Sequence, residues 1–290
     1  MSKLRLGVAT AVLDGEGQVL VSRRGDLGTW NLPTGRLDTG ETMVYAAARE
    51  AREETGIDVE LQRAVGLYYQ HGRSRMNVLF QAAPAGGTLK TTTDESSENA
   101  FMSTAALPTP FFGDFMVRDV LAGGTHLFVL ETPPKVLRKV QRQLAWRYVK
   151  NLLSGRPEPR WATFQVQASL AVLDRSSGAV LALPHIDNWR VLPGCAVNGD
   201  TPPWEQVRRQ VRDDYGVYEL RTAELRWVGL YENVTKKAIE FVFAAEVQPG
   251  SLISDMRIAW TPLESSRWWG GYGKMVKQLL SANEIIFVLE

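Results

Sequence analysis

The alternation of apolar and polar positions divides the chain into short strands and a few helices. Residues 6–13 and 18–23 flank the turn DGEG, which predicts an antiparallel strand pair. A second strand pair is predicted at 62–70 and 76–83. Segment 115–123 is predicted to be a helix that ends at a glycine. The pattern therefore predicts a mixed α/β fold.

A helix predicted over 41–57 is enclosed by glycines. Gly35 and Gly40 permit a tight loop before this helix, and Gly56 ends it. Residues at spacing i, i+3, i+4 and i+7 form one apolar stripe that is expected to face the core. The stripe consists of Val44, Ala47, Ala48 and Ala51. Because three of these residues are alanine, the helix is expected to lie close against its sheet.

The same helix carries three glutamates on a neighbouring face. Glu50, Glu53 and Glu54 follow the spacing i, i+3, i+4, which places their β-carbons about 5–6 Å apart. Like charges at this spacing repel, and a cation held between the oxygens would relieve the repulsion. Clustered carboxylate oxygens suit magnesium or manganese rather than zinc or copper. The alternative is an ordinary salt-bridged surface formed with Arg49 and Arg52, and spacing alone leaves both interpretations open.

The full pattern around these glutamates is more specific. It runs G, five residues, E, seven residues, then R-E-x-x-E-E-x-G. The chain fulfils it with Gly35, Glu41, Arg49, Glu50, Glu53, Glu54 and Gly56. This pattern resembles the signature of the Nudix hydrolases, and the preceding WNLPTG resembles a lead-in common in that family, with Thr34 in place of a glycine. The resemblance covers about 6–131 well and 161–290 more weakly.

The resemblance implies hydrolysis of a diphosphate linked to another moiety, usually a nucleoside derivative, with Mg²⁺ or Mn²⁺ as cofactor. It implies that Glu50, Glu53 and Glu54 are catalytic residues that bind the metal with help from the carbonyl of Thr34. Gly35 would support the site, and Arg49 and Glu41 would form an orienting ion pair beside it. Bound cations neutralise the phosphate oxygens and help an attacking water, so the chemistry suits such a site.

The general base and the substrate contacts are less specific in the sequence. Glu98 lies in the segment 94–102, where the family often carries a further glutamate, and Glu95 and Glu53 are alternatives. A solvated acidic loop explains this segment equally well. Arg23 and Arg24 lie where many relatives place arginines that contact phosphate; surface charge is the alternative.

Four short sequence motifs (the repeated words) recur in the same order, about 160 residues apart. The pairs are VGLYYQ at 65–70 with VGLYEN at 228–233, AVLD at 11–14 with 171–174, WNLPTG at 30–35 with WRVLPG at 189–194, and FVLE at 128–131 with 287–290. The repeats predict a duplicated chain with domains at 1–131 and 161–290, joined by a helical linker at 132–160. The expected fold class is tandem Nudix folds, each a mixed β-sheet between helices.

The second copy has lost part of the charged pattern. Alignment on Gly216 places Arg209 over Arg49, Gln210 over Glu50, and Asp213 and Asp214 over Glu53 and Glu54. One residue is expected to be inserted between Asp200 and Arg209. Fewer and shorter carboxylates predict weak or absent catalysis, so the second domain is expected to be structural or to assist ligand binding.

Composition narrows the classes of partner. The 290 residues are 44% hydrophobic and 22% charged, with a net charge of +1, so bulk charge predicts neither specific nucleic-acid binding nor a membrane surface. The one cysteine, Cys195, excludes a disulfide within the chain and fits a reducing cytoplasm. The expected partner is a small-molecule nucleotide, and the two domains are expected to form a pseudo-dimer within one chain.

Two functions remain in contention. The first is a metal-dependent pyrophosphohydrolase with its active site in the first domain. The second is a non-catalytic nucleotide-sensing protein. The intact trio of glutamates favours catalysis, because a sensor would have little need for three charged carboxylates. Which nucleotide is bound does not follow from the sequence.

Overall fold

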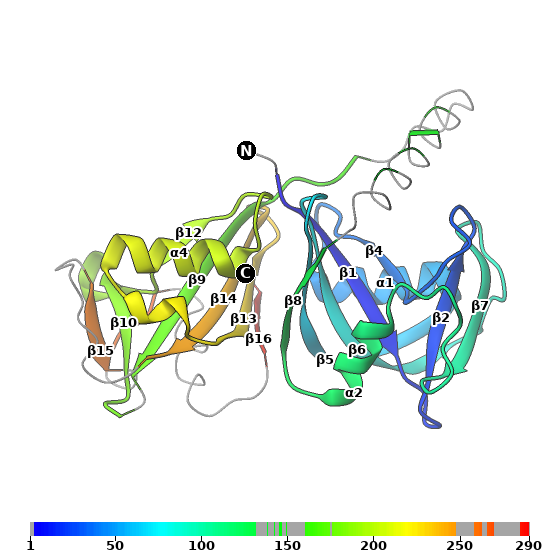
Figure 1. Ribbon diagram of the computed structural model, residues 1–290, viewed down its shortest axis with the longest axis horizontal. Helices are drawn as coiled ribbons and strands as arrows, with labels where there is room; N and C mark the ends of the chain where they lie inside the picture. The colour runs from blue at the N-terminus through cyan, green and yellow to red at the C-terminus, as the bar shows by residue number, and fades with distance from the viewer. Residues whose placement is uncertain are drawn as a thin grey trace.

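The chain forms two sheet-containing units that lie side by side (Figure 1). The computed structural model describes residues 3–131, 160–174, 176–247, 258–262, 266–269 and 285–289, with single positions between 138 and 149. The helix predicted within the linker 132–160 therefore lies almost entirely outside the described residues. Among the described helices, none is long and apolar enough to cross a lipid bilayer.

The first unit is built on a five-stranded sheet of order β4-β1-β6-β5-β8 and a three-stranded sheet of order β3-β2-β7. Its elements are β1 (Arg5–Val12), β2 (Gln18–Arg24), β3 (Trp30–Asn31), β4 (Thr34–Arg36), α1 (Met43–Thr55), β5 (Ile57–Gln70), β6 (Arg75–Gly87), β7 (Ser96–Ser103), α2 (Asp114–Ala122) and β8 (His126–Leu130). The predicted pair of β5 and β6 and the helix ending at Gly123 are confirmed.

The predicted pairing of the first two strands is wrong. Strands β1 and β2 meet only at an isolated bridge between Leu13 and Val19. Beyond this bridge β2 leaves the larger sheet and pairs with β3 and β7. The turn was readable from the sequence, but the partner of β2 follows it much later in the chain, where no local pattern reveals it.

The two helices of the first unit cover opposite faces of its larger sheet. One face packs Leu6, Val8 and Tyr69 against Ala46 and Ala47 of α1. The other packs Ala9, Ala11, Val65, Leu79 and strands of the smaller sheet against Met116, Val117 and Val120 of α2. The prediction of a mixed sheet between helices is therefore confirmed for this unit.

Helix α1 faces the sheet with a different stripe from the predicted one. Thr42 caps its start by accepting a hydrogen bond from the backbone of Tyr45, and Gly56 ends it with a left-handed conformation. The buried residues are Met43, Ala46, Ala47, Ala51, Glu54 and Thr55. Val44, predicted to be buried, is 40% exposed because the stripe starts one residue earlier, at Met43. The rotated stripe brings Glu54 to the buried side of the helix.

The second unit contains a sheet whose main path is β11-β10-β9-β14-β13-β16, with β12 paired to β9 and β15 to β10. Its elements are β9 (Gln165–Asp174), β10 (Ala179–Pro184), η1 (Ile186–Asn188), β11 (Arg190–Val191), β12 (Gly194–Ala196), α4 (Pro203–Tyr215), η2 (Tyr218–Arg221), β13 (Leu225–Asn233), β14 (Ala238–Glu246), β15 (Ala259–Pro262) and β16 (Ile286–Leu289). Strand β9 pairs with β14 and β12 in the same directions in which β1 pairs with β6 and β4.

Strand register aligns the two units more closely than the repeated words do. Val8 lies opposite Gly35, and the corresponding Ala168 lies opposite Cys195. Helices α1 and α4 each have 13 residues and end at Gly56 and Gly216. Cys195, not Gly194, therefore corresponds to Gly35, and the predicted insertion before Arg209 is wrong. The sequence match between WNLPTG and WRVLPG, which pairs Gly35 with Gly194, is therefore off by one residue.

The repeated FVLE is also displaced by one position in the structure. Phe128 lies opposite Tyr68, whereas Phe287 lies opposite Leu230, the counterpart of Leu67. Both segments nevertheless form the strand that runs parallel to the VGLY strand of their own unit. A shared strand pattern thus outweighs the match of individual letters.

The two units share one hydrophobic core cluster. It contains Leu67 and Phe80 of the first unit together with Trp227 and Phe241 of the second. The rings of Phe80 and Phe287 lie 5.9 Å apart. Two polar contacts also cross the junction. They run from the hydroxyl of Tyr69 to the carbonyl of Gly199 (2.7 Å) and from the N–H of Met43 to Oε1 of Glu232 (2.9 Å).

Candidate functional site

Strand β4 and helix α1 are joined through two glutamates on either side of a glycine. The N–H of Thr34 donates to Oε2 of Glu54 at 3.1 Å, and the N–H of Arg36 donates to Oε1 of Glu50 at 3.2 Å. A β-carbon at Gly35 would lie 1.7 Å from Cδ of Glu50. Only glycine at this position therefore lets the carboxylate of Glu50 approach the strand.

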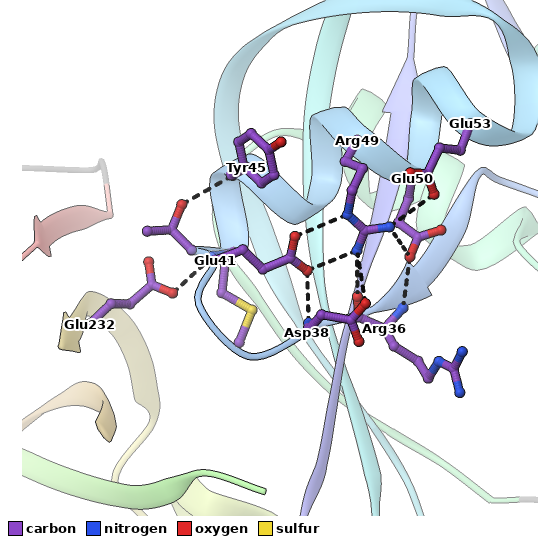
Figure 2. Close-up of polar contacts among 10 residues, drawn as sticks. Arg36, Asp38, Glu41, Tyr45, Arg49, Glu50, Glu53 and Glu232 are labelled. Atoms are coloured by element: carbon purple, nitrogen blue, oxygen red, sulfur yellow. Dashed lines mark hydrogen bonds and ion pairs between the residues drawn. The ribbon is translucent and has the colours of Figure 1, made fainter. Parts of the chain in front are cut away.

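Arg49 forms the centre of an ion-pair network (Figure 2). Its Nε and Nη2 donate to the two oxygens of Glu41 at 3.0 and 2.8 Å. Its Nη1 donates to Glu50 and Glu53, both at 3.0 Å, and Nη2 also donates to the carbonyl of Arg36 at 3.2 Å. The hydrogen bonding that Arg49 donates to Glu41 raises the pKa of Arg49 more than any other contact does. The pairing of Arg49 with Glu41 matches the role that the family resemblance implies.

The three glutamates do not converge on one empty face. Glu50 and Glu54 turn toward β4, whereas the side chain of Glu53 is 60% exposed. The guanidinium of Arg49 lies between Glu50 and Glu53 and offsets part of their repulsion. In the part of the chain that the structure describes, no three His, Cys, Asp or Glu side chains are gathered as a metal cluster.

A cavity of about 380 Å³ opens beside Glu53 and Glu54. Its lining residues are Glu53, Glu54, Lys90, Thr93, Asp94 and Glu95. Burial raises the pKa of Glu54 to about 8, and the charges of Glu50 and Glu95 act in the same direction against the hydrogen bond from Thr34. Glu54 is thus a buried carboxylate whose pKa the charge of Arg24 lowers less than burial raises it.

The donor set of this cavity fits a hard divalent cation. Four carboxylates supply oxygen atoms, and no cysteine or histidine belongs to the lining. Magnesium and manganese prefer such ligands, and magnesium retains waters that need room. Glu53 and Glu54 belong to this set, whereas Glu50 is held behind them by Arg49 and Arg36.

Of the three candidates for the general base, Glu53 and Glu95 line the cavity and Glu98 does not. Glu95 lines the cavity with Glu53 and Glu54. Glu98 lies on β7 opposite Arg23, with 3.7 Å between the charged groups, and is not among the lining residues. Arg24 is held by Asp26 through two hydrogen bonds of 2.9 and 2.8 Å. Of the two predicted substrate-contacting arginines, Arg23 is therefore the one with the looser ion pair.

Three residues at this site escaped the sequence analysis. Lys90 and Asp94 line the cavity, and Asn99 supports it from behind. The buried amide of Asn99 donates to the carbonyls of Glu54 and Lys90, both at 2.8 Å, and so joins the end of α1 to the cavity loop. Asn99 directly follows Glu98 in the sequence but belongs to no motif, so only the fold reveals its role.

The corresponding positions of the second unit lack this arrangement. The amide of Gln210 donates to Asp214, and Arg212 pairs with Asp213 at 2.6 Å, which lowers the pKa of that aspartate. Burial raises the pKa of the Cys195 thiol to about 11. All three polar counterparts of the glutamates are exposed, so none of them is a buried carboxylate beside β12.

Comparisons with known proteins give a consistent picture. A family model described as NUDIX domain matches residues 3–118. A putative 8-oxo-dGTP diphosphatase of Bacillus subtilis is 33% identical over 102 residues, which are 35% of this chain and 68% of the relative. A MutT-like protein of Streptomyces ambofaciens is 38% identical over 92 residues, which are 32% of this chain and 60% of the relative.

A mouse protein and a solved bacterial structure are also similar to this chain. The 8-oxo-dGDP phosphatase NUDT18 of Mus musculus is 37% identical over 109 residues, which are 36% of this chain and 33% of the relative. The chain thus spans only a third of that relative and 60% of the Streptomyces protein. A solved NUDIX hydrolase structure from Nitrosomonas europaea aligns with a TM-score of 0.41 and 23% identity, covering 46% of this chain and 81% of that one.

Proposed function

Since this chain belongs to the NUDIX family, we propose that its first unit is a divalent-metal-dependent pyrophosphohydrolase. Its substrate is a nucleoside triphosphate or another nucleoside derivative with a diphosphate linkage. The observation that carries the proposal is the cavity in which Glu53 and Glu54 meet Asp94 and Glu95. A cavity with four carboxylates repels a phosphate chain unless cations are present, so it suits a metal-dependent site.

Three glutamates and one backbone carbonyl are proposed to hold Mg²⁺ or Mn²⁺. They are Glu50, Glu53, Glu54 and the carbonyl of Thr34. When bound, the metal neutralises the phosphate oxygens and lowers the barrier to attack by water. Gly35 admits Glu50 to β4, and Glu41 holds Arg49 beside it, so these residues position the ligands.

Glu95 is proposed as the proton acceptor for the attacking water, with Glu53 and Glu98 as alternatives. The position of Glu95 in the cavity lining supports this order. Glu98 instead pairs with Arg23, which is proposed to contact the phosphate chain. Arg24, held by Asp26, shapes the loop that follows β2.

The first substrates to test are 8-oxo-dGDP and 8-oxo-dGTP. Two relatives that match about a third of this chain carry the names 8-oxo-dGDP phosphatase and putative 8-oxo-dGTP diphosphatase. These matches cover 33% and 68% of the two relatives.

Phosphate and pyrophosphate release from a nucleotide panel tests the activity. We expect product only with Mg²⁺ or Mn²⁺, and a loss of about a hundredfold or more in kcat/KM for Glu53→Gln, which removes one ligand charge. Glu60→Gln, an exposed position on β5, is the matched control and is expected to behave as the wild type. Absence of metal-dependent product from every nucleotide would refute the enzymatic proposal.

A nucleotide-sensing protein is the second candidate. The contact of Arg49 with both Glu50 and Glu53 favours it, because the arginine already neutralises part of the site. The sensor hypothesis predicts nucleotide binding without turnover. Calorimetric titration of wild type alongside the release assay therefore separates the two functions.

The second unit is proposed to be a degenerate Nudix domain that supports the first. Its matching strand pairing and the loss of the glutamates support this assignment. Glu232 accepts a hydrogen bond from the first turn of α1, and Tyr69 occupies the corresponding place in VGLYYQ and reaches back to Gly199. These reciprocal contacts support a pseudo-dimer within one chain.

A further inference from the structure

Four arginines gather at an edge of the first unit, and their guanidinium groups have no part in the proposed hydrolytic site. Arg5, Arg36 and Arg75 lie on the neighbouring strands β1, β4 and β6. Arg73 lies in the turn before β6. Arg5 and Arg75 are paired across β1 and β6, so like charges lie side by side.

Three of these arginines lie over the ring of Trp161, which belongs to the segment before β9. The guanidinium carbons of Arg75, Arg36 and Arg5 lie 5.1, 5.7 and 6.0 Å from the centre of its ring. Figure 2 shows the guanidinium of Arg36 turned away from the network of Glu41 and Arg49. Residues from both units thus converge on one aromatic ring.

Three members of the cluster, Arg5, Arg73 and Arg75, carry positive charges that no described carboxylate balances at close range. Within the described ranges, no carboxylate lies within 4.0 Å of the guanidinium of Arg5, Arg73 or Arg75. Arg75 instead donates to the neutral amide oxygen of Asn77 at 3.1 Å. Burial and the charges of Arg73 and other arginines together lower the pKa of Arg75 to about 10. The ring attracts cations but has no net charge, so it does not balance the cluster.

We propose that Arg5, Arg36, Arg73 and Arg75, together with Trp161, form a binding site for a phosphate group. A guanidinium presents its fork of N–H groups in its own plane, and this fork matches two phosphate oxygens. Because guanidiniums cover the ring, the site takes the phosphate and not a nucleobase. The phosphate is either free phosphate or pyrophosphate, or part of a nucleotide.

The site lies at the junction of the two units. Ser74 separates Arg73 from Arg75, and a β-carbon at Gly199 of the second unit would lie 2.6 Å from Cβ of Ser74. The backbone of Lys3 is equally close to Gly199, at 2.9 Å from that position. An anion bound here therefore holds the segment of Trp161 against the first sheet and stabilises the contact between the units.

Anion binding is measured best when the hydrolytic site is disabled. The full chain carrying Glu53→Gln is titrated in EDTA with phosphate, pyrophosphate or a nonhydrolysable nucleoside triphosphate. Sodium chloride at matched ionic strength is the reference. We expect the phosphate compounds to raise Tm by several degrees over chloride, because a ligand of the folded state stabilises it.

Substitution of Arg75 tests the location of the site. Arg75→Gln is expected to weaken binding about tenfold or more by calorimetry, since it removes a charge-assisted hydrogen bond. Arg118→Gln, an exposed arginine on α2, is the matched control and is expected to leave binding unchanged. If Arg75→Gln fails to fold, Arg5→Gln makes the same test at an exposed position.

Equal binding by the Arg75→Gln or Arg5→Gln variant and the Arg118→Gln control would overturn the proposal. So would the same Tm in phosphate compounds and chloride. The arginines would then only clamp Trp161. Tighter binding of pyrophosphate than of the nucleotide assigns the site to free anions, and the reverse order assigns it to nucleotides. A failure of hydrolysis has no influence on these results.

Discussion

Gly35 and Cys195 occupy corresponding places in the two units and differ by a side chain. At Gly35 the carboxylate of Glu50 fills the space that a β-carbon would need. At Cys195 that space is taken, and the counterpart of Glu50 is the exposed Gln210. The loss of the glycine thus accompanies the loss of the carboxylate. The sequence alignment predicted the change from Glu50 to Gln210. It did not predict the change from Gly35 to Cys195, because it paired Gly35 with the nearby glycine of WRVLPG.

Gly35→Ala is expected to lower activity strongly while leaving the fold nearly intact. The new methyl group displaces the end of a flexible side chain, so the cost in unfolding free energy is about 1 kcal/mol or less, typical of a change without a buried cavity. Displaced Glu50 loses the N–H of Arg36, and kcat/KM falls about a hundredfold. Gly15→Ala is the control, because no atom lies within 4 Å of its added carbon. A kcat/KM of the Gly35→Ala variant equal to that of the Gly15→Ala control would contradict this account.

Helix α1 shows how far an element can be predicted from its own sequence. The helix ends at Gly56 as predicted, and two of the three glutamates singled out by their spacing, Glu53 and Glu54, line the cavity. The buried stripe was displaced by one residue, because the start of the helix depends on Thr42 as a cap and on Glu232, which is distant in the chain. The loop of Asp94 and Glu95 also reaches the helix through tertiary contacts alone.

Glu232 on β13 accepts a hydrogen bond from the start of α1 and makes the free energy of unfolding depend on pH. Burial raises its pKa from 4.5 to about 7 against the opposing hydrogen bond from Met43, and the residue is only 5% exposed. The folded protein therefore binds this proton more tightly than the unfolded chain. The contribution to stability is complete below pH 4.5 and is lost as the pH rises through 7.

Glu232→Gln is expected to remove this dependence, since an amide oxygen still accepts the hydrogen bond. Above pH 7 the variant should be about 2–3 kcal/mol more stable than the wild type, and near pH 4.5 the two should be equal. Urea unfolding between pH 4.5 and 8 measures the difference. Glu60→Gln, which lies exposed on β5, should parallel the wild type. A constant difference across this range would show that Glu232 does not titrate there.

The whole molecule is held together by a core that neither unit completes alone. Trp227 is 1% exposed and belongs to the same buried cluster as Phe80 of the first unit, and the 36% exposed ring of Phe287 lies 6.5 Å from Trp227 and 5.9 Å from Phe80. The repeated words predicted two units, but they carried no information about this shared core. Contacts between units depend on which faces meet, and apolar strand residues look alike whether they face a helix or a partner unit.

Because the core is continuous, the two units are expected to unfold in one cooperative transition. Trp227→Ala should lower the free energy of unfolding by about 3–5 kcal/mol, as removal of a buried ring does. It should shift the single calorimetric peak and increase amide exchange in β1, although Trp227 lies in the other unit. Tyr218→Ala, at an exposed ring of the second unit, should shift the peak little. Two separate peaks, with only one displaced by Trp227→Ala, would mean that the units fold independently and that the second cannot support α1.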